Sequence, residues 1–293
     1  MESRSVAGTL YIVSTPIGNL EDITHRALRI LREVDVIACE DTRYTRKLLN
    51  HFAIDVATIS YHEHNERERA GELCTMLAAG KNIALVSDAG TPIVSDPGFR
   101  VVNLAIEKGF RVVPIPGATA FVAALSASGL PSDQFFFAGF LPARASARRA
   151  QLEEFRVTDA TLIFYEAPHR IAATLRDAAE ILGNRAAVVA RELTKLHEEL
   201  ARGRLDELAE NFSARNKARG EIVLLIAGPQ SENDIDQGPK TVTSSQALAE
   251  RVSTLEHEGL NEKAALRKAA RELGLKRDEA YRLMLTQKNR RSK

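Results

Sequence analysis

Residues 82–98 read NIALVSDAGTPIVSDPG, an apolar run followed by residues that favour turns. The run at 82–88 predicts a buried β-strand, and the serine, aspartate, glycine and proline residues after it predict a loop with accessible backbone groups. In open α/β sheets, ligands bind in the loops at the carboxyl ends of the strands. We therefore expect residues 87–98 to be shaped around a ligand, with a solvated surface loop as the alternative interpretation.

Further strands flank this stretch, and helical patterns separate them. In the first half of the chain they are expected at residues 9–14, 35–40, 57–62 and 111–116. A second region has strands at 133–142, 160–168, 186–194 and 220–229, with a hairpin near 197–205. Strands that alternate with helices predict an α/β protein with mostly parallel strands.

The chain is expected to divide into four parts. A cluster of Gly, Pro, Ser and Asp near Leu130 to Pro131 separates an α/β domain at 1–130 from a second one at 131–229. Residues 230–243 are polar and lack periodicity, which predicts a linker, and 244–293 form a small helical domain. In this last part, a helix ending at Gly274 and another starting near Arg277 fit a helix-turn-helix or, equally, any tight helical hairpin.

The composition is that of a folded globular protein. Of 293 residues, 44% are hydrophobic, and there are only 17 glycines and 10 prolines, which excludes disordered and fibrous proteins. Cys39 and Cys74 have neither metal-ligand nor C-x-x-C spacing, so we expect two buried, reduced thiols and no metal site. The apolar stretches are too short for a signal peptide or a membrane span, which predicts a cytoplasmic protein without membrane contact.

Charge is distributed unevenly along the chain. The net charge is +1, yet residues 238–293 hold 13 lysines and arginines against 7 acids. A basic segment on an acidic body predicts contact with a polyanion such as RNA, with Lys276, Arg277 and Arg282 as candidate phosphate contacts. A solvated helix face has the same composition, and charge alone does not separate the two interpretations.

Three further loops follow predicted strands. The sequence STPIGN at 14–19 lacks G-x-G-x-x-G, and no G-x-x-x-x-G-K-[ST] occurs, so the usual dinucleotide and nucleoside triphosphate sites are disfavoured. PGATA at 116–120 places Thr119 at a helix N-terminus, which suits a ligand carboxylate as well as a plain helix cap. YEAPHR at 165–170 ends a strand of the second region.

Six motifs carry a family resemblance. In chain order they are STPIGNLEDIT, CEDTRYTRKLL, SDAGTPIVSDPGFRVV, PIPGATAFVAAL, FFFAGFLP and LIFYEAPHRI. Together they resemble the tetrapyrrole methylase superfamily over about residues 9–229. More narrowly, the chain is similar to the branch that uses S-adenosylmethionine to methylate the ribose 2′-oxygen of a cytidine in small-subunit (16S) ribosomal RNA.

The resemblance implies two α/β domains of tetrapyrrole-methylase type with a cofactor cleft between them, a C-terminal helix-turn-helix and a homodimer. It also places a set of residues against the cofactor. They are Pro16, Ser87, Asp88, Ala89, Val94, Ser95, Thr119, Ala120, Tyr165, Glu166, Leu193, Ala227 and Pro229. The first loop departs from the superfamily, because relatives that act on tetrapyrroles carry G-x-G-P-G where this chain has S-T-P-I-G. The substrate therefore cannot be taken from the superfamily as a whole.

Methyl transfer to a hydroxyl requires alignment of donor and acceptor, and a base can assist it. The candidates lie after the second and third strands, in CEDTRYTRKLL and SYHEHNER: Asp41, Arg43, Lys47, His62, Glu63 and His64. Arg43 and Lys47 also suit RNA phosphates. The alternative interpretation of these residues is a solvated loop for SYHEHNER and a solvated helix face for CEDTRYTRKLL.

The sequence is compatible with two other functions. One is a methyltransferase of the same fold acting on a tetrapyrrole or another small molecule, which CEDTR and the basic C-terminal segment disfavour. The other is a non-enzymatic RNA-binding or ribosome-assembly factor. Binding of S-adenosylmethionine, measured by thermal shift, separates the second from the enzymes.

Overall fold

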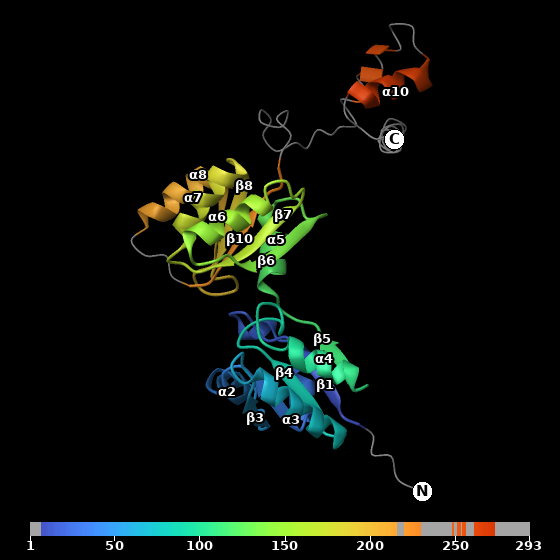
Figure 1. Cartoon of the computed structure of the whole chain (residues 1–293), viewed down its shortest axis with the longest axis vertical. Coiled ribbons are helices and arrows are strands. Elements are labelled where there is room, and N and C mark those ends of the chain that lie inside the picture. Colours follow the sequence, from blue (N-terminus) through green and yellow to red (C-terminus); the bar gives the residue numbers. More distant parts are fainter. Residues whose placement is uncertain are drawn as a thin grey trace. The chain divides into compact units, whose positions relative to one another are not determined.

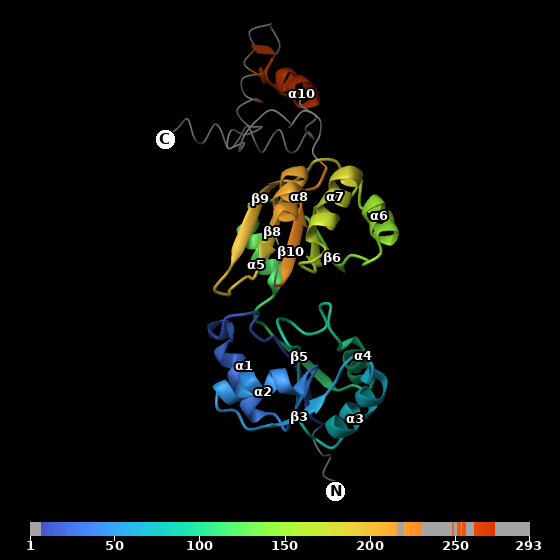
Figure 2. The same cartoon turned by 90° about the vertical axis from the view of Figure 1, so that its left-hand side faces the viewer.

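The computed structural model describes residues 7–215, 220–229, 248, 251–252, 254–255 and 261–272. The chain forms two compact units, Met1–Gln230 and Ser231–Lys293, and the first contains two separate β-sheets (Figures 1 and 2). None of the helices in the described part has the length and hydropathy that a membrane crossing requires.

The first sheet is entirely parallel, in the order β3-β2-β4-β1-β5. Its strands are β1 (Thr9–Val13), β2 (Val36–Cys39), β3 (Ala57–Ser60), β4 (Ile83–Val86) and β5 (Arg111–Ile115). Each lies inside a run that the sequence predicted. Because all five are parallel, the loops after them meet at one edge of the sheet.

Helices cover both faces of this sheet: α1 (His25–Glu33) and α2 (Thr42–His51) on one, α3 (Glu66–Ala78) and α4 (Phe99–Glu107) on the other (Figure 2). Successive residues of a strand point alternately to the two helix layers. Ile37 and Cys39 pack with α1 and α2, whereas Ala38 packs with α3 and α4. Both cysteines are free and buried, as predicted.

The second sheet is mixed, in the order β6-β7-β10-β8-β9. Its strands are β6 (Phe135–Phe140), β7 (Thr161–Glu166), β8 (Ala186–Arg191), β9 (Glu199–Arg204) and β10 (Ile222–Ile226). The pair β6 and β7 is parallel, and the other pairs are antiparallel. The predicted hairpin is the β8–β9 pair.

The second sheet is also covered on both faces. On one lie α6 (Ala145–Glu154), α7 (Ile171–Leu182) and α8 (Leu205–Ala214), and on the other lies α5 (Ala120–Ser128) (Figure 2). Ala124 and Leu125 of α5 pack against this sheet, so the helix belongs with the second sheet. Helix α5 ends at its C-cap Gly129, which has a φ of +80°, just before the expected boundary at 130–131, and that boundary stays a prediction.

The second compact unit contains a small apolar core. This core includes Leu248, Val252 and Leu255, together with Ala265 and Ala269 of α10 (Glu262–Glu272). Arg251 and Glu272 are joined by an ion pair of 2.7 Å. The expected linker at 230–243 and the second helix near Arg277 lie outside the described residues.

Candidate active site

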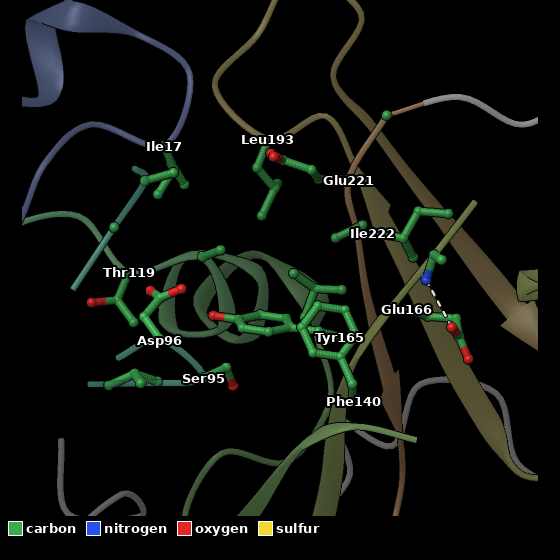
Figure 3. A pocket seen from close by; sticks show the side chains of 18 of the residues that line it. Ile17, Ser95, Asp96, Thr119, Phe140, Tyr165, Glu166, Leu193, Glu221 and Ile222 are labelled. Atoms are coloured by element: carbon green, nitrogen blue, oxygen red, sulfur yellow. Dashed lines mark hydrogen bonds between the residues drawn. The ribbon is translucent and has the colours of Figure 1, made fainter. Parts of the chain in front are cut away.

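A cavity of about 350 Å³ lies within the first unit, a size that suits a small organic ligand. Its walls come from the loop after β4, from the start of α5 and from the second sheet (Figure 3). Tyr165 lies near the end of β7, Leu193 follows β8, and residues 220–223 span the start of β10. The loops of both α/β regions thus contribute to one site.

The loop after β4 has an unusual backbone. Ile93 and Ser95 have φ angles of 78° and 68°, which β-branched and other non-glycine residues rarely adopt. Gly98 has a φ of 146°, and a side chain there would lie 2.7 Å from the Ile93 side chain. The carboxylate of Glu66 in α3 accepts hydrogen bonds from the Gly98 and Arg100 amides, each of 3.2 Å. Such strain is typical of loops shaped for a ligand.

Three loops are tied together at the cavity. The Thr15 and Gly90 backbones exchange hydrogen bonds of 2.8 and 3.1 Å, which joins the first loop to the loop after β4. The Thr91 hydroxyl lies 2.9 Å from that of Ser14 and 2.7 Å from that of Thr119. Short polar side chains and close backbone contacts therefore hold this wall in one arrangement before any ligand binds.

Two aspartates give the cavity an acidic wall. Burial and then the nearby Glu40 raise the pKa of Asp96 to about 6. Burial also raises the pKa of Asp88, although its Oδ1 accepts a hydrogen bond of 3.1 Å from the Asp41 amide. Tyr165 points into the cavity together with Asp96 (Figure 3), and burial raises its pKa to about 12, so the phenol is neutral. The site can accept a cation and can take up a proton.

Glu166 lies at the wall of the cavity, and its carboxylate makes contacts of its own. Glu166 lines the cavity, but its carboxylate turns away from it (Figure 3). The carboxylate accepts hydrogen bonds from the Ala167 amide at 2.7 Å and the Thr174 hydroxyl at 2.6 Å, and it pairs with Arg170 at 2.5 Å. It is buried and fully used in anchoring the start of α7, so it supports the wall and does not present charge to a ligand.

The structure brings most of the expected cofactor residues to this cavity. Those that line it are Asp88, Ala89, Val94, Ser95, Thr119, Ala120, Tyr165, Glu166 and Leu193. Pro16 and Ser87 line a neighbouring cavity.

Ala227 and Pro229 lie outside both cavities. Because β10 is antiparallel to β7 and β8, its carboxyl end lies at the opposite edge of the sheet. Residues 220–223 at its amino end line the main cavity, and contact of Ala227 and Pro229 with a cofactor stays a prediction.

Sequence reasoning missed several lining residues. They are Ile17, Gly90, Thr91, Asp96, Phe140, Ala167, Pro168, Ala190 and residues 220–223. Gly90, Thr91 and Asp96 belong to the turn-rich loop at 87–98, so its composition was the signal that could have found them. The residues of the second sheet had no such local signal.

The CEDTR segment forms the end of β2 and the start of α2. Asp41 caps α2 and accepts hydrogen bonds from Arg43, from the amide at 2.8 Å and from the guanidinium at 3.1 and 2.8 Å. These bonds lower the pKa of Asp41 to about 2, which makes it a poor base. Lys47 lines the neighbouring cavity, whereas Glu63 is exposed and lines neither.

Lys276, Arg277 and Arg282 lie outside the described residues. Within the described ranges, no cluster of three or more His, Cys, Asp or Glu residues could hold a metal ion.

The sequence model of one protein family, the tetrapyrrole (corrin/porphyrin) methylases, matches residues 9–209 of this chain. A ribosomal RNA small subunit methyltransferase I of Halalkalibacterium halodurans is 46% identical over 288 residues, which cover 96% of both chains. Its namesake in Micromonospora olivasterospora is 49% identical, over 94% of this chain and 86% of its own.

Among solved structures, uroporphyrin-III C-methyltransferase from Thermus thermophilus in complex with S-adenosylhomocysteine has a similar fold. The TM-score is 0.53 at 21% identity, over 74% of this chain and 97% of that one. At this identity the likeness shows a shared fold alone.

Proposed function

The chain belongs to the tetrapyrrole (corrin/porphyrin) methylases, and from this premise we propose that it methylates small-subunit ribosomal RNA with S-adenosylmethionine. The observation that supports this proposal most strongly is sequence identity. The chain is 46–49% identical, over nearly its whole length, to proteins named ribosomal RNA small subunit methyltransferase I. Within that activity, the acceptor is the ribose 2′-oxygen of a cytidine in 16S RNA. The protein works in the cytoplasm, on an assembling or assembled subunit.

The cavity beside Asp96 fits S-adenosylmethionine. Its volume of about 350 Å³ lies in the range of small-ligand sites, and its acidic wall complements a ligand with a positive sulfur and a positive amino group. Asp96, Thr119 and Tyr165 would hold the ligand with the backbone of residues 88–91. When bound, S-adenosylmethionine supplies a methyl group made reactive by the positive charge of its sulfur.

Asp88 is the residue that takes up the proton of the acceptor hydroxyl. It lines both the main cavity and its neighbour, so it lies where the two meet. The Asp41 amide holds its Oδ1 in place, and Arg43 in turn holds the Asp41 carboxylate. The CEDTR segment therefore positions the proposed base, because Asp41 and Arg43 act through Asp88.

The function is tested by mapping ribose methylation in 16S RNA from a strain that lacks the gene. One cytidine is expected to lose its 2′-O-methyl group, and a plasmid-borne copy of the chain is expected to restore it. Purified chain should also methylate small subunits from that strain and show a thermal shift with S-adenosylmethionine. A thermal shift without any change in RNA would indicate a small-molecule methyltransferase, and no shift would indicate a non-enzymatic assembly factor.

The basic segment at 238–293 is expected to bind RNA phosphates. Truncation after Pro239 should reduce the dependence of RNA affinity on salt, because each phosphate contact contributes about −0.7 to −0.9 to the log–log slope. Affinity for S-adenosylmethionine should not change, since the cavity residues all precede 230. Filter binding between 50 and 300 mM salt measures the slope. The matched full-length variant replaces Lys276, Arg277 and Arg282 with Glu. An unchanged slope would assign RNA binding to other residues.

The second sheet has an exposed apolar edge that supports a homodimer. Strand β6 is at the edge, and its Phe135, Phe136 and Phe140 are exposed by 47%, 45% and 58%. Edge strands of this kind are normally protected from pairing by charge or proline. Phe136→Glu is expected to convert a dimer to a monomer in sedimentation velocity, whereas Ile106→Glu on α4 should have no effect. A wild-type chain that sediments as a monomer would contradict the proposal.

A further inference from the structure

A second cavity adjoins the first one. It measures about 290 Å³ and lies between the first loop, α2 and residues 87–88. Asp88 lines both cavities, so the wall between them contains the residue to which the proton transfer is assigned. An acceptor in the second cavity would lie directly beside a donor in the first.

The walls of the second cavity combine an aromatic ring, an apolar side chain and a cation. Tyr44, in the first turn of α2, is 54% exposed, and Leu20 is 38% exposed. The Lys47 ammonium lies 5.8 Å from the centre of the Tyr44 ring. Flat aromatic faces with a neighbouring cation are the usual means by which proteins bind single nucleotides, through base stacking and a phosphate contact.

The size of the cavity limits what can enter. A space of about 290 Å³ can hold a single nucleoside but not a base pair within a helix. Enzymes that modify one nucleotide in RNA or DNA commonly extrude it from the stack, or take it from a single-stranded region. The acceptor must therefore reach Asp88 as an unstacked residue.

We propose that this cavity is the acceptor-nucleoside site, in which the extruded base stacks on Tyr44 and Lys47 contacts its backbone phosphate. The proposal rests on the proposed function and gives it a substrate-binding residue that touches no part of the methyl-donor cavity. Since every base has a face that can stack, Tyr44 holds the nucleoside in place but does not select cytidine.

The test uses the full chain with small subunits from a strain lacking the gene, and tritiated S-adenosylmethionine. Tyr44→Ala is expected to lower kcat/KM for the subunits by about ten- to a hundredfold, the range for loss of one base–aromatic stack. Tyr44→Phe keeps the ring face and should stay within about threefold of wild type. Affinity for S-adenosylmethionine, measured by titration calorimetry, should be the same in all three proteins.

Lys47→Met provides an independent measurement. It should reduce the log–log salt slope of subunit binding by about 0.7 to 0.9, whereas Tyr44→Ala should leave the slope unchanged. Lys108→Met at the end of α4, an exposed lysine outside both cavities, is the matched control and should change nothing. Because Tyr44 and Lys47 are exposed, the unfolding midpoint of each variant is expected to match wild type.

The outcomes distinguish failure of the nucleoside site from failure of the proposed function. Wild-type rates in Tyr44→Ala, in a chain that methylates subunits, would overturn the nucleoside site and leave the proposed function standing. Weaker binding of S-adenosylmethionine in Tyr44→Ala and Lys47→Met would assign this cavity to the donor and also overturn the proposal. A wild-type chain that transfers no methyl group to ribosomal RNA would overturn the proposed function, and the nucleoside site with it.

Discussion

Asp88→Asn is expected to lower kcat for RNA methylation by about 10²- to 10⁴-fold, the usual contribution of a positioned base. The amide oxygen of asparagine can still accept the hydrogen bond that the Asp41 amide donates to Asp88 Oδ1. The side chain therefore keeps its place but can no longer take up a proton. Single-turnover methylation of small subunits measures the effect, and titration calorimetry should find that the affinity for S-adenosylmethionine falls far less than kcat does.

The pH dependence of the same step provides the control. Burial raises the pKa of Asp88 in the folded chain, and only the ionised carboxylate can accept the proton. The rate should therefore rise with pH up to this raised pKa and then level off. In Asp88→Asn the rising limb should be absent. A limb that persists in Asp88→Asn and disappears in Glu63→Gln would identify Glu63 as the base, as the sequence had suggested.

Asp96→Asn is expected to weaken S-adenosylmethionine binding about tenfold or more at pH 7.5 and to stabilise the unliganded chain. A carboxylate beside a positive ligand commonly contributes one or more pKa units of coupling, which is at least a tenfold change in affinity. Titration calorimetry measures this loss. In wild type the affinity should also fall as pH decreases through about 6, because Asp96 becomes protonated there.

The stability effect of Asp96→Asn has the opposite sign. Burial raises the Asp96 pKa from 3.8 to about 6, so ionisation costs folding free energy progressively as pH rises through this window. Above pH 6 the cost is complete, and asparagine removes it. Because Asp96 is only partly buried, we expect a gain of about 1 kcal/mol in the free energy of unfolding, well below the full linkage value. Urea unfolding at pH 7.5 and pH 4 checks it, since the gain should be much smaller at pH 4.

Unchanged affinity in Asp96→Asn would remove this residue from the donor site. Lower stability at pH 7.5 would show that its carboxylate makes a favourable contact in the unliganded chain. Ser95→Ala, a neighbouring lining residue without charge, is the matched variant and should leave both the pH dependence of binding and the pH dependence of stability unchanged.

Much of the chain's architecture can be predicted from local patterns. The five parallel strands of the first sheet lie in predicted runs, because an apolar run between turn formers is a short-range signal. The loop at 87–98 was singled out by its turn residues, and it does form a wall of the cavity. Parallel strands also bring their following loops to one end of the sheet whatever the strand order, so CEDTR and SDAG could be placed at the same end, whereas the pairing of β2 with β4 makes them neighbours.

Strand direction, partnership and burial are decided only by the tertiary structure, because they depend on residues far apart in the chain. The antiparallel direction of β10 brings residues 220–223 to the cavity and takes Ala227 to the far edge. The carboxylate of Glu166 is used by Thr174 and Arg170, which no spacing reveals. The raised pKa of Asp96 and the cavity beside Tyr44 likewise arise from burial among several segments, and burial is a property of the packed fold, not of any one stretch of sequence.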